Sequence, residues 1–203
     1  MSAYAGEVAD SNSLSSAGQS QPWVVALRLE SSLDSSVHSP VVSVQVMLGT
    51  EDADNVARSA NLDQVPDFIA ANSQGNAVLV FGDTNSRYTR AADTGIRDLV
   101  SQEGMIDAWV KHARNGSPPA AGADALLCPD GVPTNISCET VDKVFFRGSK
   151  LIDLDSTDFF YDTDRFLSPN GSLLTDHNPV RVEFSWTLAS NLRQSDLYGG
   201  PHG

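Results

Sequence analysis

AVLVFGDTN, at residues 77–85, is the stretch of sequence that decides the fold. Its first five residues form a short, continuous apolar run, which is typical of a β-strand buried on both faces and ending at Gly82. Asp83 and Asn85 then follow at the carboxyl end of that strand, the edge where α/β sheets usually bind ligands. An Asp supplies oxygen ligands or a base, and an Asn donates hydrogen bonds to phosphate oxygens without adding negative charge. A plain turn is the alternative, because Gly, Asp and Asn are common turn residues.

Around this strand the chain has an α/β order, with helices early and strands late. Pro66 lacks a backbone donor and crowds the preceding turn, so we expect the longest helix to kink or break near Gln64. The acidic run at 153–164 is expected to be a solvated loop. We expect strands over 22–30, 40–48, 77–81, 141–148, 150–156 and 179–188, and helices over 51–72 and 94–103.

Two further motifs carry titratable groups next to predicted strands. Asp176 and His177, in TDHNP directly before the last strand, place a carboxylate beside an imidazole. A His can act as a general base near neutral pH, while the Asp can hold a cation and position the ring. None of the other three histidines has a carboxylate neighbour. Asp142 enters the aromatic strand VDKVFF, where a solubilising strand-edge charge is the alternative interpretation.

The order of these motifs resembles the endonuclease/exonuclease/phosphatase superfamily, which includes deoxyribonuclease I-like nucleases, sphingomyelinases and inositol phosphate phosphatases. The resemblance implies a four-layer α/β sandwich that hydrolyses phosphate esters with Mg²⁺ or Mn²⁺. It implies that Asp83 and Asn85 contact the phosphate or the nucleophile. It also implies that Asp142 orients the catalytic His177 and that Asp176 is the metal ligand.

The longer string FGDTNSRYTR looks like fungal secreted members of the superfamily. Arg87 and Arg90 within it could face an anionic substrate, and simple surface exposure is the alternative. Substrates of the superfamily include nucleic acids, phospholipids and inositol phosphates, and the motifs do not choose between them.

The first half of the family's site is not found in this chain. Glu30 is the candidate for the metal-binding Glu, with an ordinary strand-end charge as the alternative. Ser43 and Gln45 stand where the family has an Asn and a His on a middle strand. Gln45 keeps a donor for a substrate phosphate but lacks the imidazolium charge, and loss of one electrostatic donor commonly costs about 100-fold to 1000-fold in rate. We therefore expect a partial sandwich with an incomplete N-terminal half.

Two functional hypotheses follow from these observations. The first is a divalent-metal-dependent phosphoesterase that cleaves phosphodiesters or phosphomonoesters. The second is a catalytically impaired remnant that binds a phosphorylated ligand or a partner protein.

Composition predicts the domain boundaries. Residues 1–21 carry too few large apolar side chains to fold, so we expect a disordered segment, then the partial domain over 22–189 and a linker or truncated tail over 190–203. We expect no transmembrane segment, because no apolar run is long enough, and the first residues lack the basic start and apolar run of a secretory signal. The net charge of −13 opposes the approach of DNA, although a divalent cation would invert the local field.

Cys128 and Cys138 lie ten apart across a Pro/Gly turn segment that suits a local disulfide. Two separate thiols are the alternative, which a reducing compartment would favour. Glycosylation triplets at Asn135 and Asn170 add to the case for a secreted protein. We therefore expect an extracellular location.

Overall fold

The computed structural model describes residues 25–29, 39–43 and 52–190, with side chains described from residue 54 onward. Residues 1–21, expected to be disordered, lie outside the described part, as does the predicted tail after Ser190. Among the described helices, none is long and apolar enough to cross a membrane.

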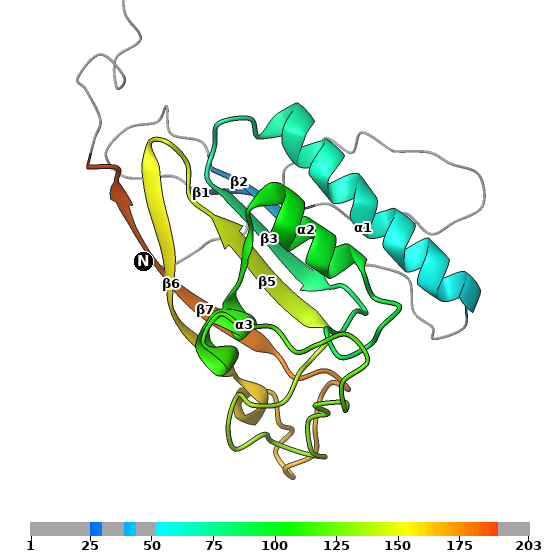
Figure 1. The fold of residues 1–203 in the computed structure, drawn as a ribbon. Coiled ribbons are helices and arrows are strands. Elements are labelled where there is room, and N and C mark those ends of the chain that lie inside the picture. The colour runs from blue at the N-terminus through cyan, green and yellow to red at the C-terminus, as the bar shows by residue number, and fades with distance from the viewer. Residues whose placement is uncertain (1–24, 30–38, 44–51, 191–203) are drawn as a thin grey trace, which may run out of the picture.

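The larger sheet has the strand order β1-β2-β3-β5-β4. β3 lies at its centre, parallel to β2 and antiparallel to β5. β1 and β4 add to the two sides as antiparallel neighbours of β2 and β5 (Figure 1). The bounds are Val25–Leu29 for β1, Ser39–Ser43 for β2, Val78–Asp83 for β3, Ile106–Asp107 for β4 and Asp142–Arg147 for β5.

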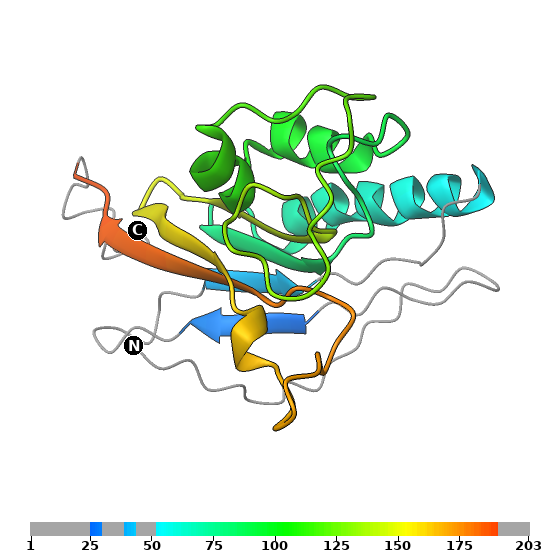
Figure 2. The same cartoon turned by 90° about the horizontal axis from the view of Figure 1, so that it is seen from below.

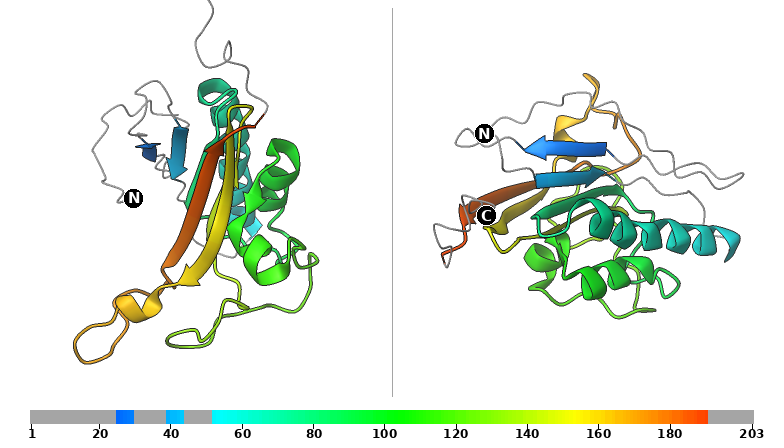
Figure 3. Two further views of the ribbon diagram at one scale, coloured as in Figure 1. Left: turned by 90° about the vertical axis from the view of Figure 1, so that its left-hand side faces the viewer. Right: turned by 90° about the horizontal axis from the view of Figure 1, so that it is seen from above.

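A second sheet consists of the antiparallel pair β6 (Ile152–Tyr161) and β7 (Val180–Leu188). Phe184 of β7 packs edge-on against Phe146 of β5, with ring centres 5.4 Å apart. The loop between β6 and β7, which includes the short helix η1 (Thr163–Arg165), projects beyond the ends of both strands (Figure 3).

Three helices lie on one side of the larger sheet (Figure 2). The longest of them carries Leu62, Val65 and Ile69, which pack with Val78 and Val80 of β3 in one apolar core. These helices are α1 (Asp52–Asn72), α2 (Gly95–Glu103) and α3 (Ala108–Arg114).

Two predictions of local structure were wrong. α1 runs without a break through Pro66, and Figure 1 shows one straight helix, because Leu62 and Ile69 on either side of the proline are buried in the same core. The run 153–161 is strand, not solvated loop. From Ile152 to Thr157 its residues alternate between more and less exposed positions, which leaves Asp153 and Asp155 facing solvent, and a register shift between Ser156 and Asp158 interrupts the alternation.

Candidate active site

Asp83 and Asp142 are cross-strand partners at the last position of β3 and the first position of β5. Directly opposed residues of an antiparallel pair share one face of the sheet, so the two carboxylates lie side by side. Since side chains alternate along a strand, this face is opposite to the one on which Val80 packs into the helical core.

His177 joins this pair from the loop that precedes β7. Its Nδ1 lies 2.7 Å from Oδ2 of Asp142. An ionised carboxylate can only accept a hydrogen bond, so this contact assigns the ring proton to Nδ1 and leaves Nε2 as the remaining ring nitrogen. The backbone N–H of His177 donates to Oγ1 of Thr175 at 3.1 Å, and Thr163 Oγ1 donates to Oδ1 of Asn178 at 2.8 Å. These two bonds fix the loop on both sides of the imidazole.

Asn85 holds Asp83 from the other direction. Its backbone N–H donates to Oδ1 of Asp83 at 2.8 Å, and its side-chain amide donates to Oδ2 at 3.0 Å. Asn85 has a left-handed backbone with φ of 48°, which Asn tolerates better than most residues. Gly82, inside β3, has a φ of 139°, a backbone conformation that a side chain would oppose. The GDTN sequence therefore aims the Asp83 carboxylate through its own turn.

The environment shifts the titration of two of these groups. Burial raises the pKa of Asp83 above its usual range, and the nearby charge of Asp142 adds to this, while the Asn85 N–H opposes it. The hydrogen bond to Asp142 raises the pKa of His177, and partial burial works against that effect. Paired titratable groups with perturbed pKa values are typical of functional sites.

The carboxylates and imidazole form a candidate cation site. One ligand atom each from Asp83, Asp142 and His177 lies within 4.8 Å of the others. Asp142 Oδ2 and His177 Nδ1 are hydrogen-bonded to each other, so these two atoms already have a partner. The Asp83 oxygens are therefore the atoms of this group that best fit a hard cation. Asp176 is exposed beside His177, outside the group of three, and its charge contributes to raising the pKa of His177.

The two predicted substrate-binding arginines hold the loop that follows Asn85. Arg90 pairs with Asp93 at 3.1 Å and donates to the backbone oxygen of Asn85 at 3.2 Å. Arg87 Nε donates to the backbone oxygen of Glu139 at 3.4 Å. Their contact with a substrate stays a prediction.

Three other predicted positions carry little structural information. Gln45 and Glu30 lie outside the described residues. The backbone of Ser43 pairs in register with Phe81 of β3, which places the end of β2 next to the strand that carries Asp83.

The structure joins Cys128 to Cys138 in a disulfide with a Cα–Cα distance of 4.8 Å, the pairing expected from their spacing. The sequence interpretation missed the next residue, Glu139, which is fully buried together with Lys143. The available signal was an acidic and a basic residue four apart at the entry of an apolar strand, a pattern that usually marks exposed charges.

Comparison with known proteins finds relatives by sequence and by fold. No family model matches the chain. Over 134 residues, 66% of its length, the chain is 30% identical to proteins named sphingomyelinase from Mycobacterium tuberculosis and Mycobacterium bovis. The chain spans 26% of the length of these relatives.

Solved structures with a similar fold include the catalytic domain of human Nocturnin with a bound sulfate. The TM-score is 0.52 at 18% identity, covering 82% of this chain and 53% of that one. TDP2 from D. rerio, in complex with a single-strand DNA product, gives 0.51 at 15% identity, covering 74% and 58%. The fold is thus a mixed α/β domain with an acidic and imidazole site at one end of its central strands. The chain belongs to the endonuclease/exonuclease/phosphatase superfamily.

Proposed function

We propose that this chain hydrolyses phosphate esters with the help of a divalent metal ion, Mg²⁺ or Mn²⁺. The observation that carries the proposal is the convergence of Asp83, Asp142 and His177, which are far apart in the sequence, within 4.8 Å. Membership of the superfamily supports the same class of reaction.

Asp83 is the member of the group of three that would hold the ion, and the resemblance adds Asp176, which lies beside His177. Oxygen ligands suit Mg²⁺, and a cation would stabilise the charged form of Asp83, which burial and Asp142 disfavour. A bound divalent ion polarises a phosphoryl oxygen and offsets negative charge in the transition state.

The protein's own residues would position and activate the attacking water. Asp142 keeps the proton on Nδ1 of His177, so Nε2 is the ring atom that can accept a proton from the water. The two hydrogen bonds from Asn85 fix both oxygens of Asp83, which leaves their other lone pairs to orient the nucleophile. The water oxygen would bond to phosphorus in line with the leaving ester oxygen, whose P–O bond breaks while a proton of the water passes to Nε2 of His177.

We propose a phospholipid phosphodiester as the first substrate class to test. The support comes from the sphingomyelinase relatives and from the net charge of −13, which opposes binding of long DNA. Because the chain spans only 26% of those relatives, the activity of the whole relatives stays a proposal here.

The impaired-remnant hypothesis has its own support. Gln45 stands where the family pattern has a His, and no convincing metal-binding Glu was found in the sequence. A remnant would bind phosphate-bearing ligands without measurable turnover.

The fuller fold and the location are also proposals. A four-layer sandwich is supported by the resemblance to Nocturnin, of which this chain covers 53%. An extracellular location is supported by the disulfide, since such bonds persist in oxidising compartments.

The test is hydrolysis of bis-p-nitrophenyl phosphate with Mg²⁺ or Mn²⁺, with EDTA, and by the Asp176→Ala/His177→Ala double variant. Turnover that EDTA and the double substitution both abolish supports the phosphoesterase. A folded protein with no turnover under any of these conditions supports the remnant. Sphingomyelin and single-stranded DNA, compared at equal phosphodiester concentration, then test the substrate class.

A further inference from the structure

A buried ion pair lies directly behind the candidate active site. Lys143 Nζ donates to Oε1 of Glu139 at 2.8 Å, and the two side chains are 1% and 0% exposed. The ammonium also lies 4.9 Å from the ring centre of Tyr88 and 5.0 Å from that of Trp109, and it faces the buried carboxylate of Asp107. Burying such a pair is costly unless its remaining hydrogen-bonding capacity is used.

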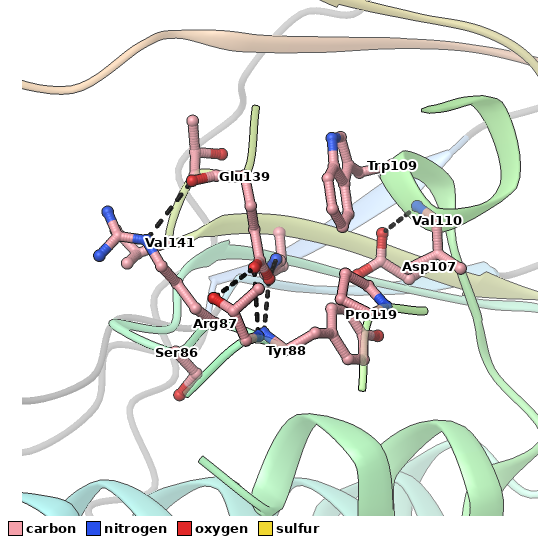
Figure 4. Close-up of polar contacts among 12 residues, drawn as sticks. Ser86, Arg87, Tyr88, Asp107, Trp109, Val110, Pro119, Glu139 and Val141 are labelled. Atoms are coloured by element: carbon pink, nitrogen blue, oxygen red, sulfur yellow. Dashed lines mark hydrogen bonds and ion pairs between the residues drawn. The ribbon is translucent and has the colours of Figure 1, made fainter. Parts of the chain in front are cut away.

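Glu139 uses that capacity on the loop that follows Asn85 (Figure 4). Its Oε1 accepts the backbone N–H of Tyr88 at 2.5 Å. Its Oε2 accepts from both the backbone N–H and the hydroxyl of Thr89, at 3.4 Å and 3.3 Å. One buried carboxylate therefore fixes the backbone three and four residues beyond Asn85.

Lys143 connects the same carboxylate to the other half of the site. It follows Asp142 on β5 and points to the opposite face of the strand, because side chains alternate. Its cross-strand partner is Gly82, next to Asp83. The Glu139–Lys143 pair thus ties together the strand that carries Asp142 and the loop whose beginning aims Asp83.

We propose that Glu139 is a positioning residue for the phosphoesterase site, acting through the backbone of Tyr88 and Thr89 on Asn85 and Asp83. Replacing a buried ion pair by apolar residues is often neutral for stability, so stability alone is a weak reason for this pair, whereas fixing one arrangement is a better-attested use. The inference rests on the proposed function.

The decisive variant is Glu139→Gln/Lys143→Met, which removes both charges of this pair and leaves the buried Asp107 carboxylate with its hydrogen bond from the Val110 N–H. The Gln amide keeps one accepting oxygen but places its NH₂ against the N–H of either Tyr88 or Thr89, so the loop loses one of its two anchoring bonds and the negative charge behind the other. We expect kcat on bis-p-nitrophenyl phosphate to fall roughly 100-fold, as for an ångström-scale misplacement, with KM little changed. Glu139→Asp keeps the charge but withdraws the carboxylate by one methylene, and should lower kcat by a smaller factor.

The matched control is Glu103→Gln, which breaks the Glu103–Arg147 pair of 2.9 Å at the other end of β5. This variant should keep the kcat of the parent protein. If the charge-free variant and Glu139→Asp are both folded and keep the parental kcat, Glu139 has only a structural role and the inference is overturned. If the charge-free variant does not fold, Glu139→Asp decides in the same way.

A second readout separates this inference from the proposed function. Hydrogen exchange of the Asn85 amide, which donates to Asp83 Oδ1, reports the order of the GDTN turn without any turnover. We expect faster exchange in the Glu139 variants and no change in Glu103→Gln. If the parent protein hydrolyses nothing, the proposed function fails and exchange alone decides the positioning role. Unchanged exchange in that case overturns it.

Discussion

The two sides of the candidate site are built differently. Asp83 and Asp142 stand on paired strands, with the buried Glu139–Lys143 pair behind them. His177 and Asp176 come from the loop between β6 and β7, where Phe166, Leu173 and Leu174 are exposed. One side of the site is part of the sheet, and the other is part of a surface loop.

This difference separates the consequences of substitution on the two sides. A side chain on the sheet has its position and its pKa set by burial and by fixed neighbours, so changing it alters folding energetics as well as chemistry. A side chain on the loop has fewer packed contacts, so changing it should alter chemistry much more than stability. Each of the following experiments tests or refines that contrast.

The largest effect is expected for His177→Ala on the loop side. Loss of a general base typically costs about 100-fold to 10,000-fold, so kcat should fall by that amount while the melting temperature stays close to that of the parent. Steady-state hydrolysis and thermal unfolding measure the two quantities. His112→Ala is the control, because that imidazole contacts Ser156 away from the site and should leave kcat unchanged. A large loss of stability in His177→Ala would contradict the contrast.

Asp83→Asn on the sheet side should lower activity and preserve or raise stability. Activity should fall roughly 100-fold to 1000-fold, because a placed charge at the reaction centre is lost. Burial raises the pKa of Asp83, which means that the folded protein holds the charged form less favourably than the unfolded chain does. Above that raised pKa the charge is destabilising, so its removal at pH 7 should raise the melting temperature or leave it unchanged.

The exposed Asp153 on β6 supplies the comparison for this experiment. Asp153→Asn should change neither activity nor the melting temperature. A marked fall in the stability of Asp83→Asn at pH 7 would show that the carboxylate gains more from its Asn85 hydrogen bonds than it loses by burial.

The residues of the site differ in how well the sequence predicts them. Asp83, Asn85, Asp142 and His177 could be singled out in the sequence because each belongs to a short motif next to a strong apolar strand, and their roles in a reaction stay predictions. Pairing of β3 with β5 then brings Asp83 and Asp142 together. Asp142 is the first residue of β5, and it contacts His177 in the loop that precedes β7. Such placements follow from local sequence and from a resemblance.

The supports of the site could not be found in this way. Glu139 and Lys143 look like ordinary exposed charges in sequence, and only tertiary packing buries them against Tyr88 and Trp109. The break expected at Pro66 failed for a related reason, because packing of the whole α1 face outweighs one missing hydrogen bond. Contacts between residues far apart in the chain determine both the burial of Glu139 and Lys143 and the continuity of α1, and the pattern of a single sequence does not reveal such contacts.

Removal of the disulfide should affect stability more than catalysis. Cys128 and Cys138 close a ten-residue separation, and a cross-link of that size contributes about 3 kcal/mol in the chain-entropy model. Cys128→Ser/Cys138→Ser should therefore unfold at lower urea concentration, with a larger m-value because the unfolded chain becomes less compact. Since Cys138 precedes Glu139, a fall in kcat beyond the effect of unfolding would extend the sheet-side support to this loop.

The smallest effect concerns the hydrogen bond between His177 on the loop side and Asp142 on the sheet side. In metal-free protein with EDTA, the pKa of His177 measured by NMR should lie above 6.5, because Asp142 stabilises the imidazolium. Asp142→Asn should lower it, and Asp153→Asn should not. A raised pKa in the folded state means that this interaction stabilises the protein fully below the unfolded pKa and is lost as pH rises through the folded value. If the pKa of His177 is unchanged in Asp142→Asn, the 2.7 Å contact does not orient the imidazole in solution, and the sheet and loop sides act independently.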